Sequence, residues 1–156
     1  MSRSAPADRT VIIGIGNPMR RDDGVGPAAV SRLRARSADA DLVVLDGEAT
    51  RLLDAWTGRQ HVIVIDAATS GEAAGTVHRI DMVTDPVPTP GRGASSHGAG
   101  LAEAVELARV LDALPDRLVV YGVEVADVSF GEGLTPAVGE ALDTLVERLI
   151  AEAAAR

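Results

Sequence analysis

The chain contains no cysteine among its 156 residues. This absence excludes disulfide bonds, iron–sulfur ligation, thiolate zinc sites and a cysteine nucleophile. Any metal ion that the protein contacts must therefore be held by oxygen and imidazole ligands, which suit hard or borderline cations.

Aromatic residues are almost as scarce, since the sequence has one Trp, one Tyr and one Phe. Hydrophobic residues nevertheless make up 46% of the chain, so the core has to be built from Val, Ile, Leu and Ala. This composition is typical of a buried parallel sheet covered by alanine-rich helices. The length predicts one domain with a core of its own.

Basic residues are the minority charge: 15 Lys and Arg against 23 Asp and Glu give a formal net charge of −8. Nucleic acid is therefore an unfavourable partner, because binding to phosphates depends on clustered positive charge. No apolar run approaches the roughly 20 residues that span a bilayer, so no membrane association is expected. Residues 1–8 lack the apolar segment of a signal peptide. We expect a cytoplasmic protein with a flexible tail over residues 1–8 and one domain over residues 9–156.

Strand-like and helix-like segments alternate along the chain. Runs of aliphatic residues predict strands, and apolar residues that recur every three or four positions predict helices. The predicted strands are 10–13, 42–45, 61–65, 75–82 and 117–122, and the predicted helices are 25–36, a short one around 52–56, 98–111 and 136–153. This alternation predicts an α/β fold: a single three-layer domain with a mostly parallel, twisted sheet of about five strands and helices on both faces.

The most informative segment is the glycine-rich turn after the first predicted strand, from Gly14 to Gly26. It carries two adjacent carboxylates, Asp22 and Asp23. A loop that approaches phosphate does not usually hold two acids, because they repel a third anion. The dinucleotide-binding fingerprint is also incomplete, since Met19 stands where its third glycine would be. Carboxylates at a strand end suit a cation or a general base better.

Further acidic residues follow the next two predicted strands: Asp46 and Glu48 come after the second, and Asp66 after the third. Ligands of an open parallel sheet bind outside the carboxyl ends of its strands, so these side chains should share one edge. For each acid taken alone, a turn or capping role is the commoner explanation. Asp22 fits a cap for the helix that starts near Gly24, and Glu48 fits a first-turn carboxylate that favours the helix dipole.

The three histidines separate by position. His61 begins its strand and should lie at the opposite edge of the sheet, and His78 should be half-buried within a strand. His97 follows a segment rich in proline and glycine and directly precedes a helix, so it can reach the acidic edge. Two or three carboxylates and one imidazole would then meet, although His97 taken alone is equally well explained as a helix N-terminal residue.

Several motifs occur in a fixed order along the chain. They are Gly14-x-Gly16-Asn17-x-x-x-x-Asp22-Asp23-Gly24-x-Gly26, then Val64-Ile65-Asp66-Ala67, Ser96-His97, Tyr121-Gly122-Val123-Glu124 and Gly133-Leu134-Thr135-Pro136. Together these motifs resemble the hydrogenase maturation endopeptidases, and the resemblance runs from about Thr10 to Ile150. The combination of order and spacing is specific to that family.

Members of this family remove a short C-terminal extension from the large subunit of nickel–iron hydrogenase once nickel has been inserted. The resemblance implies that Asp23, Asp66 and His97 are the metal-contacting and catalytic residues. It also implies that the nickel is supplied by the hydrogenase large-subunit precursor, which is the protein partner, and that no organic cofactor takes part. The hydrolytic water could be activated either by the metal or by a carboxylate acting as general base.

Gly16, Asn17 and Glu48 are the predicted substrate-binding residues. The family often has Asp-Gly-Gly-Thr after the second strand, whereas this chain has Asp46-Gly47-Glu48-Ala49-Thr50, and the charged Glu48 would change how the substrate segment sits. A turn-stabilising role explains Asn17 equally well. Two other function classes stay open: a nucleotide-binding α/β enzyme, and a non-catalytic module that binds the nickel site or a partner chain.

Overall fold

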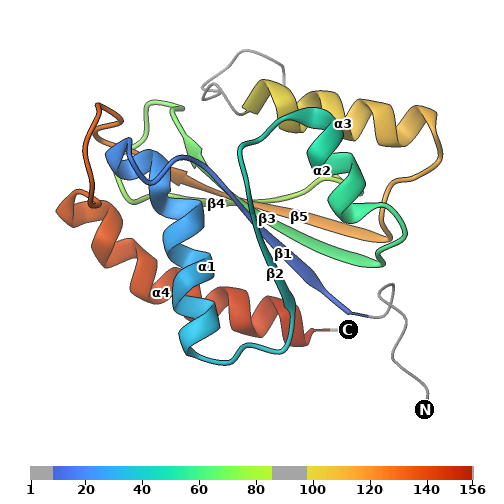
Figure 1. Cartoon of the computed structure of the whole chain (residues 1–156), viewed down its shortest axis with the longest axis horizontal. Helices are drawn as coiled ribbons and strands as arrows, with labels where there is room; N and C mark the ends of the chain where they lie inside the picture. Colours follow the sequence, from blue (N-terminus) through green and yellow to red (C-terminus); the bar gives the residue numbers. More distant parts are fainter. Residues whose placement is uncertain (1–8, 86–97, 156) are drawn as a thin grey trace.

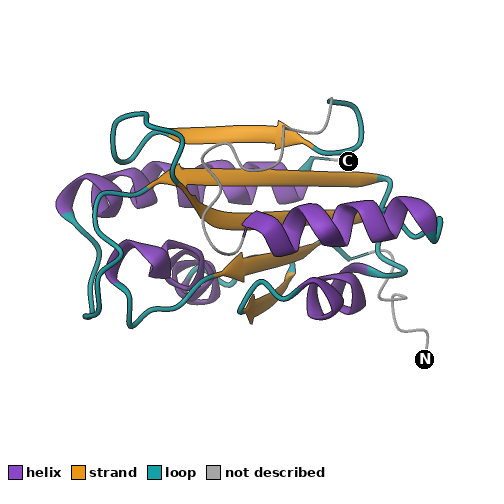
Figure 2. Ribbon diagram, turned by 90° about the horizontal axis from the view of Figure 1, so that it is seen from above, coloured by secondary structure: helices purple, strands orange, loops and turns teal. Residues whose placement is uncertain are grey.

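The computed structural model describes residues 9–85 and 98–155. Within these ranges five strands form one sheet in the order β2-β1-β3-β5-β4, and Figure 2 shows the strands side by side with helices on either side. The strands are β1 (Val11–Ile15), β2 (Asp41–Leu45), β3 (His61–Ala68), β4 (Val77–Asp81) and β5 (Arg117–Glu124). The first three and β5 are parallel, and β4 runs antiparallel to β5. The predicted α/β fold with a mostly parallel sheet is confirmed.

Helices cover both faces of this sheet. They are the short 3-10 helix η2 (Arg21–Gly24), α1 (Val25–Ala35), α2 (Ala49–Trp56), α3 (Gly98–Val110) and α4 (Pro136–Ala154). The helices α1 and α4 pack on one face, and α2 and α3 pack on the other (Figure 1). None of the helices in the described ranges combines the length and the apolarity that crossing a bilayer requires.

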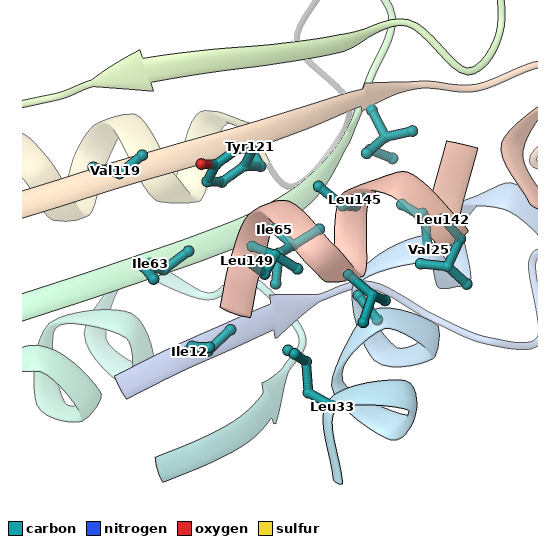
Figure 3. Packing of buried hydrophobic residues seen from close by; sticks show 14 of the residues in the cluster. Ile12, Val25, Leu33, Ile63, Ile65, Val119, Tyr121, Leu142, Leu145 and Leu149 are labelled. Atoms are coloured by element: carbon teal, nitrogen blue, oxygen red, sulfur yellow. The ribbon is translucent and has the colours of Figure 1, made fainter. Parts of the chain in front are cut away.

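The core consists of aliphatic side chains that alternate between the two faces. Ile63 and Ile65 belong to the cluster under α1 and α4, whereas Val62 and Val64 belong to the cluster under α2 and α3. Figure 3 shows Ile63 and Ile65 on the side of the sheet that α4 covers, with Leu149 of that helix packed among them. Full burial of each such side chain contributes about 1.5–3 kcal/mol. Residues 62–65 of the central strand β3, which are buried on both faces, are therefore all aliphatic, as the composition indicated.

Two strands run further than the sequence predicts. We expected Asp66 to end its strand, but β3 continues to Ala68, and β5 continues to Glu124. The reason is that the two strands support each other, since Asp66 pairs with Gly122 and Ala68 pairs with Glu124. Two acidic residues therefore lie within paired strands, near their carboxyl ends, and not in the loops beyond them.

Candidate functional site

Asp23 and Asp66 supply two buried carboxylates, each 4% exposed, at the carboxyl edge of the sheet. Asp66 lies near the end of β3, and its Oδ1 accepts a hydrogen bond from the backbone N–H of Ala67 at 2.8 Å. Asp23 lies in η2, and its Oδ2 accepts a hydrogen bond from the backbone N–H of Asn17 at 2.9 Å. These two contacts tie each carboxylate to the end of a strand.

Glycines hold the η2 turn close to the strand ends. A Cβ at Gly16, which has φ +147°, would lie 1.9 Å from the carbonyl oxygen of Asp23. A Cβ at Gly26 would lie 2.8 Å from the carbonyl oxygen of Ile65, the residue before Asp66. Only glycine permits such close approach. The turn that carries Asp23 is therefore seated against β3, and the two acids share one edge, as the sheet rule predicts.

We expect Gly26→Ala to lower the free energy of unfolding by at least about 2 kcal/mol, because overpacking against backbone atoms cannot be relieved by a rotamer change. The control is Gly139→Ala in α4, where an added Cβ meets no atom of the described residues within 4 Å. That change should stabilise the protein by up to about 1 kcal/mol, since alanine has the higher helix propensity. Urea unfolding measures both, and equal stabilities would contradict the close approach at Gly26.

His97 lies outside the described residues, as do residues 1–8, so neither the third predicted ligand nor the predicted tail is described here. The first turn of α3 reaches the same edge, because a Cβ at Gly100 would lie 2.0 Å from the carbonyl oxygen of Gly47, in the turn after β2. Across residues 9–85 and 98–155, no three His, Asp or Glu side chains are arranged to hold a metal ion. The assignment of Asp23, Asp66 and His97 as a ligand set stays a prediction.

Asp22 has a different role from the predicted one. We expected it to cap the following helix, but Gly24 is the N-cap of α1 and no side chain caps it. The Asp22 carboxylate instead accepts hydrogen bonds from the backbone N–H groups of Ala126 (2.9 Å), Asp127 (3.1 Å) and Thr135 (2.7 Å), and from the Thr135 hydroxyl (2.7 Å). The capping prediction is wrong because donors from a distant loop satisfy this buried carboxylate.

These contacts make Asp22 a buried anion whose charge is stabilised. Burial by itself would raise the pKa of Asp22, but the hydrogen bonds from Thr135, Ala126 and Asp127 outweigh it and hold the pKa below its ordinary value. Backbone hydrogen bonds between Gly131 and the residues Met19 and Arg21 join the same two loops. The loop before α1 and the loop before α4 are therefore fastened together beside Asp23.

Two further acids of this edge, Asp46 and Glu48, interact with residues at the start of α2. Glu48 is the N-cap, and its carboxylate accepts hydrogen bonds from the backbone N–H groups of Thr50 and Arg51, both at 3.1 Å. Asp46 pairs with the Arg51 guanidinium at 2.7 Å, and the hydrogen bond from Arg51 lowers the pKa of Asp46 to about 2. The prediction that the Glu48 carboxylate stabilises the first turn of a helix is confirmed, since it caps α2.

Asn17 stabilises its own turn, since its Oδ1 accepts a hydrogen bond from the backbone N–H of Met19 at 2.9 Å. The side chain is exposed at the edge that holds Asp23. The substrate-binding roles of Gly16, Asn17 and Glu48 stay predictions. The positions of the two other histidines are confirmed: His61 begins β3 at the opposite edge, and the His78 side chain in β4 is 35% exposed.

Sequence reasoning gave no role to Glu124, which is the last residue of β5 and is 1% exposed. Its carboxylate accepts hydrogen bonds from Ser70 and from His78. An acid at the end of an aliphatic run suggests a strand terminus, so the pattern gave no sign of burial. The one signal was its place in the closing motif Tyr121-Gly122-Val123-Glu124.

Known proteins are similar to this chain over most of its length, and they agree with the resemblance that the motifs show. The sequence model of a family described as hydrogenase maturation protease matches residues 27–152. The hydrogenase expression/formation protein HupD of Rhodobacter capsulatus is 28% identical over 151 residues, which cover 93% of this chain and 71% of that protein. The hydrogenase 2 maturation protease of Escherichia coli is 29% identical over 147 residues, which cover 92% of this chain and 89% of that protein.

Solved structures of similar proteins share the fold. The hydrogenase maturating endopeptidase HybD from E. coli matches with a TM-score of 0.74 and 25% identity, over 92% of this chain and 90% of that one. The [NiFe] hydrogenase maturation protease HybD from Thermococcus kodakarensis gives a TM-score of 0.74 at 21% identity, over 90% and 96% of the two chains, a likeness in fold. Since the family model covers residues 27–152, this chain belongs to the hydrogenase maturation protease family and is a peptidase.

Proposed function

We propose that this chain is an endopeptidase that removes a C-terminal extension from the nickel-loaded large-subunit precursor of a nickel–iron hydrogenase, in the cytoplasm. The observation that carries the proposal is the pair of buried carboxylates, Asp23 and Asp66, at one sheet edge of a hydrogenase maturation protease. The relatives named above are a hydrogenase 2 maturation protease and a hydrogenase expression/formation protein, which supports a hydrogenase precursor as the substrate.

In this proposal Asp23, Asp66 and His97 contact the nickel ion that the precursor brings. Oxygen and imidazole ligands suit a borderline cation such as nickel, and the chain has no thiolate to offer. Two buried carboxylates at one edge repel each other and attract a cation. A precursor that carries nickel would therefore be favoured at this edge over one that lacks it, and the metal would act as a checkpoint before cleavage.

The same edge supplies the groups that peptide hydrolysis needs. A carboxylate can accept the proton of the attacking water, and the hydrogen bond from the Asn17 backbone fixes the orientation of Asp23. The nickel of the substrate can polarise a nearby water or carbonyl group. Either route requires the scissile bond and the nickel site to reach this edge together.

The test compares two forms of the same precursor. Purified protein is incubated with nickel-loaded and with nickel-free large-subunit precursor, and mass spectrometry follows the C-terminus. We expect the loaded form to be shortened and the nickel-free form to stay intact, because only the loaded form compensates the two carboxylates. Equal cleavage of both forms would contradict the nickel checkpoint but not the peptidase.

The same experiment separates the alternatives. A precursor that binds the protein and keeps its full length would indicate a non-catalytic binding module. A nucleotide-binding enzyme would show a rise in melting temperature with an adenine nucleotide, since a ligand that binds only the folded state stabilises it. We expect no such shift.

A further inference from the structure

Three residues lie in one row across the sheet at the edge that carries Asp66. Asp66 of β3 pairs with Gly122 of β5, and Gly122 pairs with His78 of β4. Cross-strand partners project from the same face, so Asp66 and His78 flank Gly122. That face is the one under α2 and α3, because Val64 and Val120, two positions earlier in their strands, belong to its core cluster.

Gly122 leaves the middle of this row without a side chain. It is partly exposed, although β5 is an internal strand and the neighbouring Tyr121 and Val123 are 2% and 0% exposed. Adjacent strands lie about 4.8 Å apart, so Asp66 and His78 stand about 10 Å apart at the backbone. That separation leaves room for one extended polypeptide over β5, with the Asp66 side chain on one side of it and the His78 side chain on the other.

The packing of residues 9–85 and 98–155 does not require a glycine at position 122. Among the residues that the structure describes, a Cβ at Gly122 would meet only the Cβ of Ala68 at 3.4 Å, an ordinary van der Waals contact, and Gly122 is not among the glycines with a positive φ. Glycine weakens a strand interior and often marks a place where a ligand or another backbone approaches closely. We therefore explain Gly122 by the close approach of a ligand or another backbone to β5 at this position.

His78 is held in place on the far side of the row. Its Nε2 lies 2.9 Å from Oε1 of Glu124, and the same carboxylate accepts hydrogen bonds from the backbone N–H of Ser70 at 3.1 and 3.2 Å and from the Ser70 hydroxyl. Burial alone would raise the pKa of Glu124, but the hydrogen bonds from Ser70 and His78 outweigh it and hold the pKa below its ordinary value. The Nε2 atom faces the ionised carboxylate and donates a hydrogen bond to it, which leaves the Nδ1 edge of the ring for a second hydrogen bond.

This cluster is not a second catalytic centre. In a serine–histidine–acid triad the serine and the acid contact opposite nitrogens of the ring. Here Ser70 and Glu124 both lie on the Nε2 side of His78, so the imidazole cannot relay a proton from the serine to the acid. The contacts orient the His78 ring, and its side chain stays 35% exposed.

We propose that the Asp66–Gly122–His78 row is a binding strip for the backbone of the precursor's C-terminal segment, which lies extended over Gly122 and forms a hydrogen bond with His78. The inference rests on the proposed function and adds where the substrate peptide lies. Glu124 and Ser70 act as positioning residues for His78. Because the strip has no room for an extra side chain on β5, any side chain at position 122 obstructs the peptide.

The test separates substrate binding from stability in the full-length protein. Initial cleavage rates are measured over a range of nickel-loaded precursor concentrations for Gly122→Ala, Gly122→Val and His78→Ala, with the melting temperature of each variant. We expect Gly122→Val to raise KM at least tenfold and Gly122→Ala to raise it less, with kcat within threefold and no fall in melting temperature. His78→Ala should raise KM about five- to tenfold, the loss of one hydrogen bond, and His78→Gln should restore part of it.

His61→Asn is the matched control, because His61 lies at the opposite edge of the sheet, and its KM should equal that of the wild type. Unchanged KM values in Gly122→Val and His78→Ala, with normal cleavage by the wild type, would overturn the strip and leave the proposed function standing. A wild type that cleaves no precursor would overturn the proposed function and the strip with it. A rise in KM matched by a fall in melting temperature would overturn the strip, since the glycine would then serve the fold.

Discussion

Asp23→Asn is expected to abolish cleavage of the nickel-loaded precursor while the protein stays folded. Asparagine keeps an oxygen that can accept the hydrogen bond from the Asn17 backbone, but it removes the charge that we propose to contact nickel. Changes to the outer-shell partners of metal ligands cost about 10- to 100-fold, so loss of a ligand should lower the cleavage rate by more than about a hundredfold. Mass spectrometry of the precursor over time measures the rate.

The control for this variant is Asp54→Asn, an exposed acid on α2. It should cleave at the wild-type rate, and both variants should melt within a few degrees of the wild type. Asp66→Asn and His97→Ala should reproduce the loss seen for Asp23→Asn. Wild-type cleavage by Asp23→Asn and His97→Ala would remove both residues from the proposed site.

The same substitution one residue earlier, Asp22→Asn, should lower the stability of the protein, which Asp23→Asn leaves unchanged. We expect Asp22→Asn to lower the free energy of unfolding by about 3 kcal/mol, because a charged hydrogen bond is lost and a buried donor is left unpaired. Both Asp22 oxygens accept hydrogen bonds from N–H groups, so the amide NH₂ meets a donor in either orientation. At this chain length the melting temperature should fall by roughly 6–12 °C, as measured by circular dichroism at pH 7.

The pH dependence of this effect identifies its origin. The pKa of Asp22 is lower in the folded protein than in the unfolded chain, so its stabilisation is present above the unfolded value and is lost as the pH falls through the folded value. The difference in stability between the wild type and Asp22→Asn should therefore shrink below about pH 4. A constant difference between pH 7 and pH 3 would show that the ionised carboxylate is not what fastens the loops.

Local patterns in the sequence determined a large part of this protein. Aliphatic runs and helical periodicity located the strands and helices, since burial on one or both faces imposes those patterns directly on neighbouring residues. The alternation of strands and helices predicts a parallel sheet, and it places Asp23 and Asp66 at one edge because parallel strands end on the same side. The motifs indicated the family through their order and spacing along the chain, from Gly14 to Pro136.

Tertiary structure alone decided the features that depend on distant partners. The donors to Asp22 lie 104 to 113 residues further along the chain, so nothing near it in the sequence distinguishes an anchor from a cap. The antiparallel direction of β4 and the extension of β3 past Asp66 come from pairing with β5. The row that joins Asp66, Gly122 and His78 exists only because three strands are in register, and register is a property of the assembled sheet.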